Sequence, residues 1–229
     1  MFGYTARMSF IVWSTPHEGV GDEYHRWYNE VHLPDAIKNG SFTAMHRYEF
    51  AGPGHCASRY LSIAEADYAN EGEAWASVRP RAQALRDVGR IDDLYHVDFA
   101  TMLLTVTTDV SQHPVRTLTT VQNDWRRPGG DALDWFASVD VPTATPRSMQ
   151  LFTTDPLGAR GAGMHLALFE SATSLDQTVA AWQHAGTAGE SPMPSYTTLF
   201  GVTAPRPENE PPPAMTWVGH WRHLVTVGR

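Results

Sequence analysis

Two stretches of the chain share one pattern, and this internal similarity constrains the fold more than any other feature of the sequence. Residues 27–34 read WYNEVHLP, and residues 135–142 read WFASVDVP, 108 positions later in a chain of 229 residues. Shorter matches follow in the same order, namely LSIAE at 61–65 with LALFE at 166–170, and AWA at 74–76 with AWQ at 181–183. Matches that keep their order across half a chain are the signature of a repeated unit. The sequence therefore predicts two copies of one unit, residues 1–110 and residues 111–229.

Each half carries the pattern strand, helix, strand, strand, helix, strand. In the first half, Tyr24, Trp27, Tyr28 and Val31 form one apolar stripe at helical spacing, and Pro34 is expected to end that helix. The strands of the first half are predicted at 9–15, 43–50, 60–64 and 94–106, and its second helix at 71–88 with an interruption at Pro80. In the second half, strands are predicted at 116–121, 148–153, 164–169 and 215–227, with helices after Asp131 and at 174–184.

This order of elements is that of the ferredoxin-like unit, an antiparallel sheet with both helices on one face. The other face of such a sheet is bare and has to be covered. Two units in one chain can cover each other, sheet to sheet, around an internal cavity. The predicted fold class is therefore α+β, a pseudo-dimeric α+β barrel made of two ferredoxin-like units, and association of whole barrels is left open.

Composition excludes several classes of function. The formal net charge of −8 gives no general attraction to nucleic acid or to an anionic membrane. No apolar run approaches the roughly 20 residues of a membrane span, and the first 16 residues lack the layout of a signal peptide. The single Cys56 has no partner for an internal disulfide. We therefore expect a protein of the reducing cytoplasm.

The first helix and the strand after it resemble those of the dimeric α+β barrel superfamily, particularly its EthD-like members. The residues that carry the resemblance are EYHRWYNEVHLPD at 23–35 and AMHRY at 44–48. The resemblance implies a cavity enzyme that acts on a small, often aromatic or polyketide-like molecule. The chemistries of the superfamily include cyclisation, isomerisation, dehydration, cofactor-free oxygenation and haem chemistry. In the second half Phe136 replaces Tyr28 and Asp140 replaces His32, so a polar site is expected mainly in the first half.

Strand alternation gives a second set of candidates. If Leu61 and Ile63 face the helices, their neighbours in the strand face the cavity, because successive side chains point to opposite faces. The same comparison of the two halves places alternate residues of the preceding strand inside. The residues predicted to line one interior are His46, Tyr48, Tyr60, Ser62 and His165, with Trp13 as an aromatic wall.

The catalytic candidates are His32, His46 and Tyr28. Histidine titrates near neutral pH, so His32 or His46 can serve as a general base. Tyr28, or Tyr48, can donate a hydrogen bond to a developing oxyanion, and Asp35 can orient His32. The alternatives are a helix-capping His32, a packed His46 and a Tyr28 that belongs to the apolar stripe.

The last strand of each half holds further histidines. His96 and Asp98 are two residues apart and would share a face in a regular strand, as an oriented base in the substrate site or as a surface pair. His220 and His223 would point to opposite faces, so they do not form a metal pair there. We predict no bound metal and no cofactor.

The sequence thus favours a cofactor-independent acid–base enzyme, a cyclase, dehydratase, isomerase or lyase for a small aromatic or polyketide-like substrate. A cofactor-free or haem-dependent monooxygenase is the first alternative. A non-catalytic protein that binds a small aromatic ligand is the second.

Overall fold

A computed structural model describes residues 7–52, 58–108, 116–122, 132–137, 139, 148–153, 165–182 and 217–228. The chain divides into two compact units. The first comprises Met1–Glu49, Ser58–Thr105 and His223–Arg229, and the second comprises Phe50–Ala57 and Val106–Arg222. These units are not simple halves of the chain, because the last strand, β8 (Trp217–Gly228), supplies its first part to the second unit and its second part to the first.

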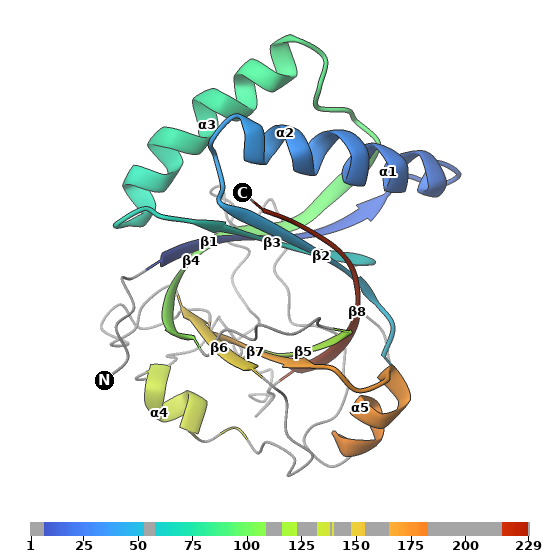
Figure 1. The fold of residues 1–229 in the computed structure, drawn as a ribbon, viewed down its shortest axis with the longest axis vertical. Coiled ribbons are helices and arrows are strands. Elements are labelled where there is room, and N and C mark those ends of the chain that lie inside the picture. Colours follow the sequence, from blue (N-terminus) through green and yellow to red (C-terminus); the bar gives the residue numbers. More distant parts are fainter. Residues whose placement is uncertain are drawn as a thin grey trace, which may run out of the picture. The chain divides into compact units, whose positions relative to one another are not determined.

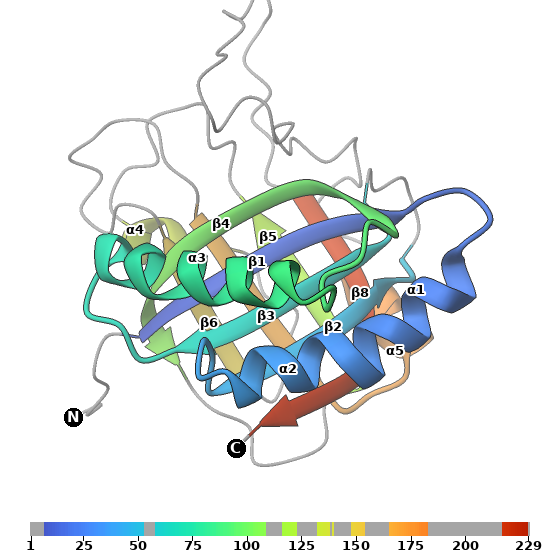
Figure 2. The ribbon, with the colours of Figure 1, turned by 90° about the horizontal axis from the view of Figure 1, so that it is seen from above.

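The first unit is an antiparallel sheet with helices on one face (Figure 1, Figure 2). Its strands are hydrogen-bonded in the order β4-β1-β3-β2. The elements in chain order are β1 (Arg7–Pro16), α1 (Gly21–Trp27), η1 (Tyr28–His32), α2 (Leu33–Lys38), β2 (Ala44–Phe50), β3 (Tyr60–Ala66), α3 (Glu71–Asp87) and β4 (Tyr95–Thr108).

The second unit has the same succession of strands and helices. Its strands are antiparallel in the order β8-β5-β7-β6. The elements are β5 (Thr117–Gln122), α4 (Ala132–Ala137), β6 (Ser148–Thr153), β7 (His165–Ser171), α5 (Leu175–Ala181) and β8. In both units the first strand lies between the third and the fourth, which is the ferredoxin-like arrangement. The predicted α+β fold class is confirmed.

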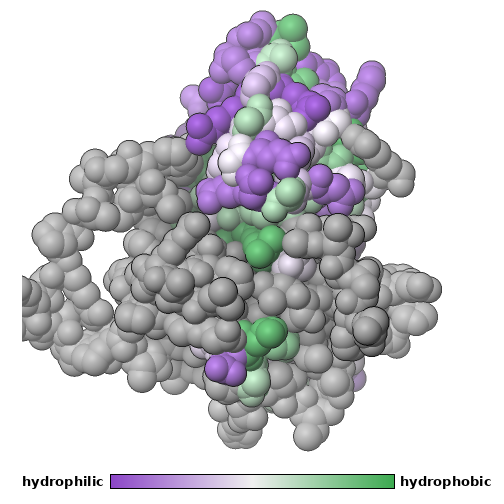
Figure 3. Space-filling view, turned by 90° about the vertical axis from the view of Figure 1, so that its left-hand side faces the viewer, coloured by the Kyte–Doolittle hydropathy of each residue, from purple (hydrophilic) through white to green (hydrophobic). Residues whose placement is uncertain are grey.

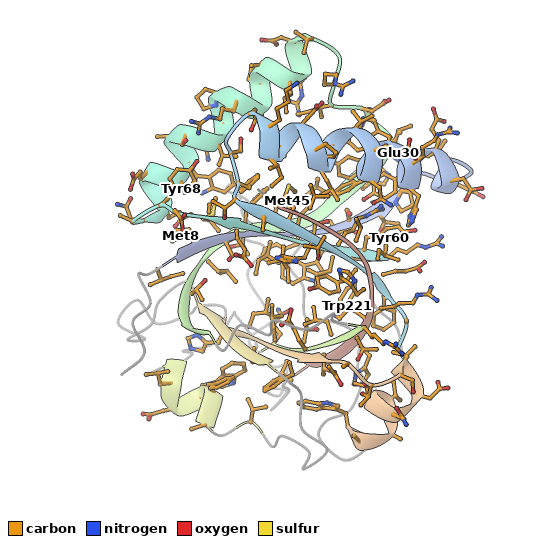
Figure 4. The ribbon with its side chains drawn as sticks, in the orientation of Figure 1. Met8, Glu30, Met45, Tyr60, Tyr68 and Trp221 are labelled. Atoms are coloured by element: carbon orange, nitrogen blue, oxygen red, sulfur yellow. The ribbon has the colours of Figure 1, made fainter. Side chains whose placement is uncertain are left out.

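The core of the first unit lies between the helices and the sheet. Tyr24, Tyr28 and Leu33 of the first helical segment pack on Met45 of β2 and Ala64 of β3. Figure 4 labels Met45 and Tyr60, which belong to this layer. The strand residue Ala64 is small, so the helical side chains can pack closely over the middle of the sheet.

The alternation predicted for β3 is reversed. Tyr60 and Ala64 lie on the helix-covered face, within the same cluster as Tyr24, and Ser62 shares their parity. Leu61 and Ile63 occupy the opposite face, where both are buried. Because both faces of β3 are buried, apolarity does not distinguish them, and the large aliphatic residues fill the face away from the helices.

The first helix does not end at Pro34. It continues to Lys38 through a π-helical turn, in which the Leu33 amide donates to the carbonyl of Tyr28 five residues earlier. Pro34 follows in the first turn of α2, where the missing N–H of proline is tolerated. The turn keeps the helix continuous and sets the positions of Tyr28 and His32 at its two ends.

The helix α3 is continuous across Pro80, contrary to the predicted interruption. Pro80 and Ala76, four residues earlier, are both exposed, so water can bind the carbonyl that the proline leaves without a donor. The Asn70 side chain caps the helix by accepting from the Glu73 amide. Hydrophilic residues predominate on the outer side of the helical layer in Figure 3.

The sequence also predicts a glycine-rich turn at 158–163, loops at 185–195 and 203–213, and an extra strand at 196–202, and all of these segments lie outside the described residues. Among the residues that are described, no helix is both long and apolar enough to cross a membrane.

We expect Ala64→Leu to destabilise the first unit. Ala64 is 1% exposed between helix and sheet, so three added carbons must displace packed neighbours, at a cost of about 1–3 kcal/mol. The control is Ala84→Leu, the same change on an exposed position of α3. Urea unfolding measures both variants, and equal midpoints for the two would contradict the close packing described here.

Candidate active site

A buried arginine marks the helix-covered face of the first unit. Arg47 of β2 has no exposed surface. Its guanidinium carbon Cζ lies 4.4 Å from the ring centroids of Tyr28 and Tyr60 and 4.8 Å from that of Tyr24. Cations at this distance over an aromatic face are attracted by its quadrupole. We call Arg47 with Tyr24, Tyr28 and Tyr60 the arginine cage.

Strand alternation and the helix together build this cage. Met45 and Arg47 are two residues apart in β2, and Met45 belongs to the helix-facing core, so Arg47 points to the same side. Tyr24 and Tyr28 are one helical turn apart and face the sheet. Tyr60 begins β3, which pairs with β2 in the register Arg47↔Ser62.

The hydrogen bonds of Arg47 leave two nitrogens without a partner. Its Nη1 donates to Oδ1 of Asn29 at 2.7 Å and lies 3.5 Å from the carbonyl oxygen of His25. Nε and Nη2 are buried and have no acceptor among the described residues. Within the described part of the chain, no carboxylate forms an ion pair with Arg47. An uncompensated buried charge costs several kcal/mol, which three tyrosine rings at about 0.5–2 kcal/mol each offset in part.

The tyrosines of the cage keep their phenolic protons. Burial is the largest cause that raises the pKa of Tyr24, and its hydroxyl lies 2.9 Å from Oγ of Ser14. Burial also raises the pKa of Tyr28, against the smaller opposing effects of Ser62 and Arg47. Both phenols are therefore neutral hydrogen-bond donors at physiological pH.

His32 adjoins the cage through Tyr28. Its ring centroid lies 4.7 Å from that of Tyr28 and 5.0 Å from that of Trp27, on which it stacks. Burial, with a smaller contribution from Arg47, lowers its pKa to about 4, and Asp35 opposes the shift. His32 is therefore neutral at pH 7, and its Nδ1 is buried without a hydrogen-bond partner.

Asp35 does not hold His32 by a hydrogen bond. Its two oxygens accept from Nε and Nη2 of Arg90 at 2.6 and 3.0 Å. The predicted orientation of His32 by Asp35 is therefore absent from the structure, because Arg90 occupies both carboxylate oxygens.

His25 falls outside the apolar stripe of the first helix, a position typical of a solvated residue, yet it borders the cage. Its Nδ1 lies 3.5 Å from Nη1 of Arg47, and its ring centroid lies 5.9 Å from that of Tyr60. Partial burial and the positive charge of Arg47 lower its pKa. His25 is therefore a second neutral imidazole at the rim of the same cluster.

His46 lies on the opposite face of the sheet, in a chain of polar contacts. Its Nε2 is 3.0 Å from Oε1 of Glu65, and its Nδ1 is 3.0 Å from Oγ1 of Thr226. The Thr226 hydroxyl also lies 2.9 Å from Nε2 of His223. The ring of His223 packs edgewise on that of Tyr48. Both imidazole nitrogens of His46 are thus engaged.

The structure divides the predicted interior residues between two faces. Tyr48 and Trp13 each pair with Leu61 in the sheet register, so they share the face of His46. Trp13 is buried beside Phe99 there. Tyr60 and Ser62 are on the helix-covered face instead. The prediction that they share one interior with His46 is wrong, because the parity of β3 is reversed.

His165 also faces helices. Its ring centroid is 5.4 Å from that of Trp135 in α4, and Ala167 and Phe169 of the same strand parity belong to the helix-side cluster of the second unit. Its predicted place in the interior beside His46 is therefore wrong, for the same reason of parity.

His96 and Asp98 do not pair. Nε2 of His96 lies 2.9 Å from Nδ1 of His17, and Asp98 accepts from the hydroxyl of Thr15 at 2.7 Å. The register between β1 and β4 shifts after Trp13, so that Asp98 is an extra residue in β4. A β-bulge of this kind interrupts the alternation on which the expected His96–Asp98 pair rested.

Two members of the cluster, Arg47 and His25, were missed in the sequence. The signal for Arg47 was present, since it follows Met45 at a spacing of two in a half-buried strand. His25 falls outside the apolar stripe of the first helix, and only the three-dimensional position of Arg47 shows that it lies near the cage.

The second unit has Phe136 where the first has Tyr28, and His165 where the first has Tyr60. Phe136 of α4 stacks on Phe169 at 5.9 Å. Among the described residues, no group of three or more histidine, cysteine, aspartate or glutamate side chains could hold a metal ion in either unit.

No protein-family model and no curated protein matches the chain. The solved structures to which it is similar include three of low identity. A chlorite dismutase-like protein has a TM-score of 0.47 and 10% identity, covering 97% of this chain and 96% of its own. An anthrone oxidase-like protein has a TM-score of 0.48 and 12% identity over 99% and 94%. A monooxygenase-like protein from Fusobacterium nucleatum subsp. nucleatum ATCC 25586 has a TM-score of 0.43 and 7% identity over 98% and 94%.

The lowered pKa of His32 predicts an acid-dependent loss of stability. A histidine whose pKa is about 4 when folded and about 6.5 when unfolded stabilises the fold above pH 6.5 and loses that contribution as the pH falls towards 4. The urea midpoint of His32→Gln should therefore fall less between pH 7 and pH 4.5 than that of the wild type. The control is His96→Gln, at an exposed position. If the urea midpoints of His32→Gln and the wild type fell in parallel with pH, the lowered pKa of His32 would be refuted.

Proposed function

We propose that the chain is an enzyme that acts by acid–base catalysis on a small aromatic or polyketide-like molecule, without a bound cofactor. The observation that supports this function is the arginine cage. A buried guanidinium with free N–H groups, among aromatic rings and beside neutral imidazoles, suits a flat substrate that carries or develops negative charge. The reaction would be a cyclisation, dehydration, isomerisation or bond cleavage that proceeds through an enolate or phenolate.

Arg47 would bind the negative charge of the substrate. Its guanidinium is already held in place by Asn29 and the tyrosine rings, so little reorganisation is needed when the charge arrives. In a buried site such an interaction is stronger than in water, because the surroundings screen it less. Tyr28, with its raised pKa, would donate a second hydrogen bond to the same anion.

His32 would accept the proton. Its neutral ring carries an unpartnered, buried Nδ1 beside Tyr28. Burial is the largest cause of the lowered pKa of His32, and Arg47 contributes less. A substrate anion that pairs with Arg47 would offset that smaller contribution and make His32 a somewhat stronger base. His25, at the rim, would exchange protons with solvent.

His46 remains a proposed catalytic residue on the other face, in a separate chain of contacts with Glu65 and Thr226. We assign it a lesser role, since both of its nitrogens are engaged. The proposal includes the finer resemblance to EthD-like proteins for the first unit and a location in the reducing cytoplasm, which the single Cys56 supports.

Hydrogen exchange tests the function. In D2O at pH 7, the wild type should accelerate loss of the methyl proton signal of 3,5-dihydroxyacetophenone, which NMR records. His32→Ala should reduce the acceleration about 100-fold or more, since general base catalysis contributes roughly 10²–10⁴-fold. Tyr28→Phe should reduce it less, because it removes one hydrogen bond to the enolate.

The matched control is His96→Ala, which removes an exposed histidine outside the cluster and should leave the exchange rate unchanged. Quenching of tryptophan fluorescence by the probe reports binding separately. If the probe binds and the exchange rate equals that of buffer, the chain is a carrier of aromatic ligands and the enzymatic proposal fails.

A further inference from the structure

The two unpartnered nitrogens of Arg47 are a matched pair. Nη1 is the nitrogen that binds Asn29, and Nε and Nη2 are the two without acceptors. In a planar guanidinium, the N–H of Nε and one N–H of Nη2 point in the same direction from one edge. That edge matches the two oxygens of a carboxylate in a bidentate pair.

Two acidic side chains near the cage are paired with other arginines. Glu49 of β2 pairs with Arg59 at 3.2 Å, and Asp35 pairs with Arg90. The group that holds Arg47 in place is instead the neutral amide of Asn29, which cannot cancel the charge. The fold therefore holds a buried arginine in place. No described residue pairs with the edge of the guanidinium that could bind a carboxylate.

We propose that this edge is a carboxylate subsite and that the substrate is a small aromatic carboxylate. The inference rests on the proposed function and narrows its substrate class. Its carboxylate pairs with Nε and Nη2 of Arg47, and its ring packs against Tyr28 and Tyr60. A phenolate or a simple enolate presents one oxygen, which can accept from both N–H groups but does not match their parallel directions as the two oxygens of a carboxylate do.

Equilibrium binding tests the subsite without any turnover. Isothermal titration with benzoate as the probe compares the wild type with Arg47→Lys and Arg47→Met. Charged hydrogen bonds of this kind correspond to a loss of roughly tenfold to 100-fold in affinity when removed. We expect a loss of that size for Arg47→Met. Arg47→Lys should also bind more weakly than the wild type, because an ammonium group keeps the charge and lacks the planar pair of donors.

The matched control is Arg79→Met. Arg79 of α3 lies over the ring of Trp75, at 4.9 Å, and it is exposed. This variant removes the same charge from an exposed ring contact outside the cage and should bind benzoate as the wild type does. Circular dichroism confirms that each variant is folded. If Arg47→Met does not fold, the wild type alone can test the subsite. The measurement is then its affinity for benzoate, compared with its affinities for benzamide and 4-nitrophenolate.

In that series the wild type should prefer benzoate to both analogues by about tenfold or more. Equal affinity for benzoate and 4-nitrophenolate overturns the carboxylate subsite, as does benzoate binding that Arg47→Met leaves unchanged or the absence of benzoate binding. If the chain catalyses exchange of 3,5-dihydroxyacetophenone but does not bind benzoate, the carboxylate subsite is refuted and the acid–base function stands. If it binds benzoate through Arg47 but does not catalyse the exchange, the subsite stands and the acid–base function is refuted.

Discussion

A positive charge with no negative partner among the described residues lies at the centre of the arginine cage. Arg47 is enclosed by three tyrosine rings and one asparagine, and its desolvation is offset only in part by them. The pKa of each neighbouring histidine responds to this charge, since Arg47 contributes to the lowered values of both His25 and His32. Burial is the largest cause of both shifts, and the charge of Arg47 adds to it.

The two faces of one short strand serve separate polar networks. Met45 and Arg47 of β2 face the helices, and His46 and Tyr48 face the other side. Residues adjacent in sequence are therefore divided by the thickness of the sheet. The network of His46, Glu65, Thr226 and His223 links β2 and β3 to the end of the chain, and the arginine cage links them to the first helix.

The element order was predictable because it rests on periodicity and on breakers, which are local. The ferredoxin-like pattern, the helical stripe of Tyr24 and Tyr28, and the inward parity of His46 and Tyr48 all follow from such signals. The parity of β3 was not predictable. Tyr60, Leu61, Ser62 and Ile63 are all buried, so hydrophobicity alone carries no information about which face meets the helices.

Other errors arose from geometry that departs from the ideal element. The bulge at Asp98 separates a pair that a regular strand would align. The π-helical turn carries the first helix past Pro34. The rings that enclose Arg47 are brought together by tertiary packing, which local sequence patterns do not reveal. The spacing of Met45 and Arg47 indicated that an arginine was directed into the core, but only the placed neighbours show that no described carboxylate forms an ion pair with it.

The second part of β8 belongs to the first unit, and this bears on how the chain folds during synthesis. Leu224, Val225 and Val227 pack on the same core as Tyr24 and Met45, although a ribosome translates them long after β4. The sheet of the first unit can therefore gain this segment only after the whole second unit has emerged. Until then the edge of β2 and the polar side of His46 lack their β8 neighbours. A nascent chain would need to keep that edge from pairing with other chains, and its maturation would be limited by translation of the intervening segment.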